Sequence, residues 1–156
     1  MLDERTRTHI ERELTQLRRL LQDYAELLAI SSSEEPELIS RTALSTVLQS
    51  FYQGVESVFQ TVAKRTDQHM PTGADWHRQL VNQMAKSSAT RSPLISANTV
   101  ERLEPYLGFR HLARHTYPFS LEWNRMCQLV QELASVSERF CSDVRKFIEH
   151  AEHSDS

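Results

Sequence analysis

The chain has 156 residues, a formal net charge of −3 at pH 7 and a sequence pI near 6.2. This length predicts a single domain with a core of its own. Proteins that follow a long phosphate backbone are usually basic, so the charge disfavours extended nucleic-acid binding and leaves open a compact site for one phosphate. With 3 glycines and 5 prolines, the composition favours long helices over a turn-rich β-sandwich.

The N-terminal part of the chain predicts two long helices separated by a polar break. Residues 3–30 carry apolar side chains at spacings of three and four, which is the pattern of an amphipathic helix. This stripe consists of Ile10, Leu14, Leu17, Leu21, Tyr24 and Leu28. The segment SSSEEPE (31–37) interrupts it, and we expect Ser33 or a neighbouring serine to cap the next helix. Residues 37–66 have a broad apolar face, and Gly54 within it allows another helix to approach closely.

A short third helix is predicted over residues 74–87. Asp75 is a candidate capping carboxylate at its start, and the motif ADWHRQL places Trp76 and His77 in its first turn. We interpret these two residues as an apolar anchor and a capping histidine. The serine-rich segment 87–96 reads as a loop.

Two further helices complete the predicted fold. Residues 97–117 form the fourth, with Asn98 or Thr99 near its start, and Pro118 ends it because proline disfavours a helical residue before it. The fifth spans residues 119–151, where apolar side chains again recur with helical spacing. Helices joined by short loops pack as antiparallel neighbours. The sequence thus predicts an all-α antiparallel bundle of about five helices.

The whole chain, residues 1–156, reads as one helical domain with a frayed C-terminal tail from about residue 150. The N-terminus is charged from its third residue, unlike a signal peptide, and no apolar run reaches the roughly 20 residues that a membrane span needs. Cys127 and Cys141 lie in one predicted helix, too far apart along its axis to pair. We expect reduced thiols in a cytoplasmic protein with no membrane partner.

The stretch FRHLARHTYP (109–118) concentrates polar, chemically active side chains at the end of the fourth predicted helix. Those residues are Arg110, His111, Arg114, His115 and Tyr117. The two arginines are one helical turn apart, as are the two histidines. The tyrosine lies two turns beyond Arg110, on nearly the same bearing. Because the proline ends the helix here, we expect these side chains to meet at an exposed corner.

This set of side chains suits metal-independent cleavage of an RNA phosphodiester. Histidine titrates near neutrality, so His115 can take the proton of an attacking 2′-hydroxyl. The transition state gains negative charge, which a permanently charged, forked guanidinium such as Arg110 stabilises. One copy supplies one clear base, whereas full acid–base catalysis needs two groups. Two copies related by a twofold axis would supply both, so we expect a homodimer.

Two plainer interpretations of the stretch stand beside this one. The spacing of an arginine and a histidine five residues apart is common, so the stretch alone fits a solvated helix end. His111 and His115 could also face a zinc ion, but no HExxH pattern, nearby cysteine or third ligand accompanies them. We therefore predict no metal site.

Several segments together resemble HEPN-domain ribonuclease toxins of the HepT type. RHLARHTY (110–117) fits the pattern R-x4-H-x-Y. FYQGVESVFQTVAKR (51–65) is similar to the family's second-helix segment, an aromatic pair followed by a glutamate. PTGADWHRQLVNQM (71–84) resembles its turn and short helix around a Trp-His pair. The segment 92–123 resembles the region leading through the catalytic motif, and the resemblance extends from about residue 8 to 148.

The resemblance implies an all-helical homodimer whose two R-x4-H motifs face each other across a cleft. It implies a ribonuclease without metal or cofactor, acting on tRNA or mRNA, in which Arg110 and His115 are catalytic. His111, where relatives often carry Asn, and Arg114 would support them. Such toxins are paired with a minimal nucleotidyltransferase (MNT) antitoxin in a type VII-like system. In systems with the H-x-Y extension, the antitoxin transfers AMP to the motif tyrosine, here Tyr117.

A second hypothesis belongs to a different functional class. The chain could be a non-catalytic helical binding module that docks a nucleotidyltransferase and offers nucleotide contacts through Arg110 and Arg114. The acidic pI favours this module over a strong RNA binder, whereas His115 beside Tyr117 favours the ribonuclease. Toxicity of the protein expressed alone separates the two hypotheses.

Overall fold

The computed structural model describes residues 2–30 and 34–154, which contain six α-helices. These are α1 (Glu4–Asp23), α2 (Ala25–Ile30), α3 (Leu38–Val62), α4 (Trp76–Met84), α5 (Ala97–Arg114) and α6 (Trp123–Ser154). A π-helical turn, η1 (Ala63–Asp67), follows α3, and a 3-10 turn, η2 (Pro118–Ser120), precedes α6. Apart from one isolated bridge between Ser88 and Arg91, the described residues form no β-structure. The predicted all-α class is confirmed.

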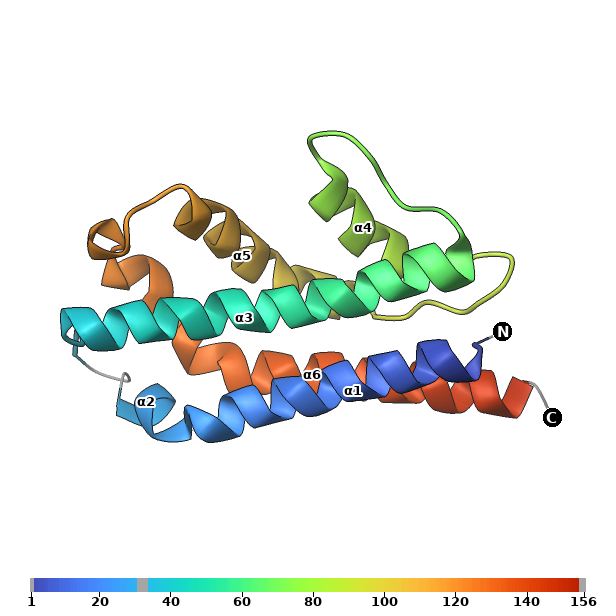
Figure 1. The fold of residues 1–156 in the computed structure, drawn as a ribbon, viewed down its shortest axis with the longest axis horizontal. Helices are drawn as coiled ribbons and strands as arrows, with labels where there is room; N and C mark the ends of the chain where they lie inside the picture. Colours follow the sequence, from blue (N-terminus) through green and yellow to red (C-terminus); the bar gives the residue numbers. More distant parts are fainter. Residues whose placement is uncertain (1, 31–33, 155–156) are drawn as a thin grey trace.

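The three long helices form the body of the bundle, and the two helices that carry the polar motifs lie on one side of it. Figure 1 shows α1 and α3 running in opposite directions, with α6 beside α1 and with α4 and α5 on the far side of α3. The start of α1 and the end of α6 meet at one end of the bundle, where Arg7 pairs with Glu152 at 2.5 Å. None of the described helices has the length and apolar character that crossing a bilayer requires.

Helix α3 is the central element because its side chains are buried on most sides. Twelve of its residues are buried, including Phe51, Val55 and Phe59, as expected for a helix packed between others. Its contact with α1 is very close at Gly54, where an added Cβ would lie 2.7 Å from Leu17 Cδ2. The predicted role of Gly54 in close helix packing is confirmed.

The first predicted helix is divided in the structure. Its stripe is correct through Ile10, Leu14 and Leu17, which are all buried. At Tyr24 the backbone leaves helical geometry (φ −106°, ψ 16°) and α1 ends. The helical period therefore does not continue, and Tyr24, predicted to join the buried stripe, is 41% exposed.

The ends of the remaining helices differ from the predictions for local reasons. The predicted cap Ser33 lies outside the described residues, and α3 begins after Glu37 without a side-chain cap. Asp75 precedes α4 but makes no capping hydrogen bond. The cap of α5 is Ser96, whose hydroxyl accepts from the Thr99 amide at 3.1 Å, so Asn98 and Thr99 lie inside the helix.

A buried ion pair joins the end of η1 to the loop after α4. Arg91 donates from Nε and Nη2 to the two oxygens of Asp67, at 2.6 and 2.7 Å. Both side chains are nearly inaccessible, at 3% and 6% exposure. Gln83 of α4 donates to the same carboxylate at 2.8 Å, and Arg91 also donates to the backbone carbonyls of Lys86 and Ser92. These bonds fix the C-terminal end of α4 on the bundle.

At the C-terminus, α6 begins at Trp123, four residues later than predicted, and continues to Ser154. The tail expected from about residue 150 is therefore helical as far as that residue, and residues 155–156 lie outside the described part of the chain.

Candidate active site

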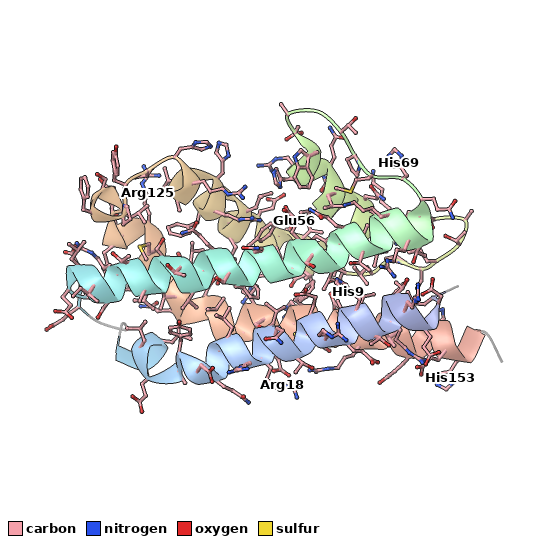
Figure 2. All side chains as sticks on the ribbon, viewed as in Figure 1. His9, Arg18, Glu56, His69, Arg125 and His153 are labelled. Carbon is pink, nitrogen blue, oxygen red and sulfur yellow. The ribbon has the colours of Figure 1, made fainter. Side chains whose placement is uncertain are left out.

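A pocket of about 500 Å³ lies between α4 and the C-terminal half of α5. Four of the five polar residues singled out from the sequence line it: Arg110, His111, Arg114 and His115. The facing wall comes from the turn before α4 and from its first residues. Figure 2 labels Glu56 on α3, in the region between these two helices. The fold thus brings most of the predicted site residues to one cavity.

Arg110 is buried against α3 and bonded to Glu56, and it does not lie at an exposed corner. Its residue exposure is 9%, because this part of α5 packs on α3. Its Nη1 donates to Glu56 Oε1 at 3.2 Å, and Glu56 itself is only 5% exposed. The prediction of an exposed corner is therefore wrong for Arg110. A guanidinium has five N–H donors, so those not used by Glu56 are available to a ligand in the pocket.

The two histidines of the motif contact each other, as their one-turn spacing predicts. The ring centroids of His111 and His115 are 5.0 Å apart, with an edge-to-face angle of 66°. Both residues are exposed at the rim of the pocket. His115, the base expected from the sequence, is therefore accessible from solvent.

The fourth predicted helix ends earlier than expected, which separates Tyr117 from the other motif residues. Helix α5 stops at Arg114, and the His115 amide turns back to the Leu112 carbonyl at 3.2 Å. Tyr117 is extended (φ −64°, ψ 143°), as expected for a residue before proline. The predicted bearing of Tyr117 above Arg110 is therefore wrong. Tyr117 is 73% exposed and does not line the pocket. Its ring stacks on that of Phe119, with centroids 5.3 Å apart.

The structure adds two residues that the motif did not include, Glu56 and His77. His77 Nδ1 lies 2.6 Å from Glu56 Oε2, so one carboxylate holds a histidine from α4 and Arg110 from α5. The Trp76 ring lies against His77 with centroids 3.6 Å apart, and Trp76 packs against the core as the predicted anchor. The predicted capping role of His77 is wrong, because its ring nitrogen engages Glu56 instead. A glutamate within the buried face of 51–62 was the available signal, since a buried charge requires a partner.

A buried phenol lies one helical turn before Glu56. Tyr52 is fully buried, and its hydroxyl has no hydrogen-bond partner among the described residues. Burial, and then the negative charge of Glu56, raise the pKa of Tyr52 well above its usual value. Tyr52 is therefore neutral at physiological pH and adds no charge beneath the site.

The pocket lining is rich in cationic and titratable nitrogen groups. It includes three guanidinium groups, of Arg78, Arg110 and Arg114, whereas Asp75 is its one acidic residue. Arg78 lies 4.0 Å from Asp75 and 3.8 Å from Glu104. No group of three potential metal-binding side chains occurs in the part of the chain that the structure describes. Guanidinium and imidazole donors of this kind are suited to a phosphate group.

Comparison with known proteins gives one family assignment. Comparisons with curated proteins and with solved structures each found no match. A family model described as HepT-like protein matches residues 43–151, which is more than half of the chain and includes α4, α5 and the whole pocket. The chain therefore belongs to the HepT-like protein family.

Proposed function

We propose that the protein is the toxin of a HEPN/MNT toxin–antitoxin pair and acts as a metal-independent ribonuclease on tRNA or mRNA. The observation that carries this proposal is the pocket between α4 and α5, in which Arg110, Arg114, His111 and His115 line one cavity. Membership of the HepT-like family supports it. The cavity of about 500 Å³ has room for a phosphate and its neighbouring sugar.

In the proposed reaction, His115 takes the proton of a 2′-hydroxyl, and the freed oxygen attacks the adjacent phosphorus. Arg110 binds the non-bridging oxygens, on which negative charge accumulates. Its bond to Glu56 holds the guanidinium in place before substrate arrives, so little reorganisation is needed during the reaction. Arg114 and His111 support this binding from the same wall of the pocket.

The active form is proposed to be a homodimer. Each copy would bring its own arginine–histidine motif to a shared cleft, as the family resemblance implies. The rim position of His111 and His115 supports this arrangement, because exposed side chains can meet a second copy.

Neutralisation is proposed to occur when a nucleotidyltransferase antitoxin modifies Tyr117. The phenol oxygen would attack the α-phosphorus of ATP and lose its proton, pyrophosphate would leave, and the tyrosine would carry AMP. The 73% exposure of Tyr117 supports access by such an enzyme. The added phosphate would bring negative charge and bulk two residues from His115 and oppose binding of RNA.

Cleavage of total tRNA in EDTA tests the proposed function. The wild-type protein, shown by mass to be unmodified at Tyr117, should yield fragments ending in 2′,3′-cyclic phosphate. His115→Ala should not, whereas His69→Ala should cleave normally, because His69 is an exposed histidine outside the pocket. Absence of cleavage by the unmodified wild type would reject the ribonuclease and favour the binding module.

Arg110→Lys provides a second test of the same site. Lysine keeps a positive charge near the buried Glu56 but loses the forked geometry, so the fold should survive better than in Arg110→Ala. We expect cleavage to fall by roughly 10²–10³-fold, with a melting temperature close to that of the wild type. Full activity of Arg110→Lys would remove Arg110 from the proposed catalytic role.

A further inference from the structure

The proposed ribonuclease requires a second proton carrier, and the pocket contains one on the wall opposite His115. The departing 5′-oxygen must gain a proton when the P–O bond breaks, and a base alone does not provide it. Three imidazoles line the pocket: His111 and His115 come from the α5 wall, and His77 comes from α4. These three differ in how they are held.

Among these three imidazoles, His77 is the one fixed by a buried carboxylate. Its Nδ1 lies 2.6 Å from Glu56 Oε2. An ionised carboxylate only accepts hydrogen bonds, so Nδ1 carries the hydrogen and Nε2 is left for another group. Trp76, at a ring-centroid distance of 3.6 Å, packs against the imidazole and limits its rotation. The side chain is 29% exposed and lines the pocket, so the ring is both oriented and accessible.

The position of His77 suits the geometry of phosphodiester cleavage. The attacking and leaving oxygens lie on opposite sides of the phosphorus, so a base and an acid work best from opposite walls. His111 is less suited to act as the acid, because its ring contacts His115 on the same wall. Glu56 also binds Arg110 through its second oxygen. One buried carboxylate therefore positions both the phosphate-binding guanidinium and the imidazole across from the base.

We infer that His77 is the general acid of the site and donates a proton from Nε2 to the leaving 5′-oxygen. This inference rests on the proposed ribonuclease function. His115 accepts the 2′-hydroxyl proton, the 2′-oxygen forms a bond to phosphorus, and the bond from phosphorus to the 5′-oxygen breaks. That oxygen takes the proton of His77, which gives a 2′,3′-cyclic phosphate and a free 5′-hydroxyl. His115 then releases its proton to solvent and His77 regains one, so protons and electrons balance over the cycle.

In the proposed homodimer, each protomer would bring an acid, His77, as well as a base, His115, to the shared cleft. Glu56 would act as a positioning residue, because it contacts His77 and Arg110 and not the reacting atoms.

The test compares two RNA oligonucleotides that share a sequence cleaved by the wild type in total tRNA and differ only in the leaving atom at the cut position. One has the natural 5′-oxygen, and the other has sulfur at that position, which leaves as a thiolate without needing a proton. His77→Asn is the suitable variant, because the asparagine amide can still donate to Glu56 while the Nε2 proton carrier is lost. His115→Ala is the comparison for loss of the base, and His69→Asn is a matched control outside the pocket.

With the natural substrate, His77→Asn should lose roughly 10²–10⁴-fold in cleavage rate, the usual contribution of a general acid. With the sulfur substrate, this variant should approach the wild-type rate, whereas His115→Ala should remain impaired.

The outcomes separate the two proposals. If the wild type cleaves no RNA in the tRNA assay, the ribonuclease proposal fails. If the wild type cleaves but His77→Asn is fully active, or is equally impaired on both substrates with an unchanged melting temperature, His77 is not the acid. If His77→Asn does not fold, His77→Gln is measured in the same way, and the same pattern across the two substrates is decisive.

Discussion

The buried ion pair between Arg91 and Asp67 leaves an uncompensated buried charge when one partner is removed, and Arg91→Met tests this cost. The variant leaves the Asp67 carboxylate, 6% exposed, without its guanidinium partner. Removing one member of a buried pair destabilises a protein by roughly 3–5 kcal/mol. For a domain of this size, about 2–4 °C of melting temperature corresponds to each kcal/mol. We therefore expect the melting temperature to fall by roughly 6–20 °C.

An exposed pair of the same chemistry is the matched control. Arg19 donates from Nε to Asp23 at 3.2 Å, but these side chains are 73% and 59% exposed. Surface pairs contribute roughly 0–1 kcal/mol, so Arg19→Met should lower the melting temperature by less than about 4 °C. Thermal unfolding followed by circular dichroism measures both variants. Equal shifts for Arg91→Met and Arg19→Met would refute the argument from burial.

The double variant Asp67→Leu/Arg91→Met isolates the interaction between the two charges. Because it leaves no single buried charge, its loss of stability should be smaller than the sum of the two single losses. Additive losses would show that the pair contributes through its neighbours, such as Gln83, rather than through mutual attraction.

Two further predictions concern buried polar groups away from the pocket. The buried Tyr106 hydroxyl donates to the Leu129 carbonyl at 2.7 Å. Tyr106→Phe should therefore lower the free energy of unfolding by about 1–3 kcal/mol. An unchanged free energy of unfolding in urea denaturation would contradict this. Burial raises the pKa of Cys141 above its usual value, so less of the reactive thiolate is present at pH 8 than for an unperturbed thiol. Iodoacetamide should therefore modify the partly exposed Cys127 before Cys141. Mass spectrometry of tryptic peptides measures the order, and earlier labelling of Cys141 would disprove the effect of burial.

Helical periodicity predicted the fold where one regular helix runs between breaks. It identified the buried stripe of α1, including Ile10 and Leu14, and the tight contact at Gly54. It failed at Tyr24 and at the end of α5, since spacing arguments assume that the helix continues. At α5, the proline after Tyr117 signalled an approaching end, but the turn at His115 closes the helix three residues before Pro118.

The sequence predicted the site residues of α5 and the turn after it, but not the contact between the other two helices. Four of its residues follow from the local spacing in α5, and the structure places them around one pocket. The link between Glu56 and His77 joins residues 21 positions apart on two helices. No local pattern encodes that meeting, because it depends on how α3 and α4 pack. The charged residue in an apolar stripe indicated that a partner existed, but not which one.

The early end of α5 places the two side chains of the arginine–histidine motif on different kinds of backbone. Arg110 belongs to a helix braced against the bundle through Glu56, whereas His115 and Tyr117 belong to the turn that leaves this helix. Arg110 is therefore fixed by packing on the bundle, whereas the position of His115 depends on the backbone of a turn that leads to the exposed Tyr117. A change in that turn would move the imidazole without moving the guanidinium, so the two side chains of the arginine–histidine motif are positioned independently.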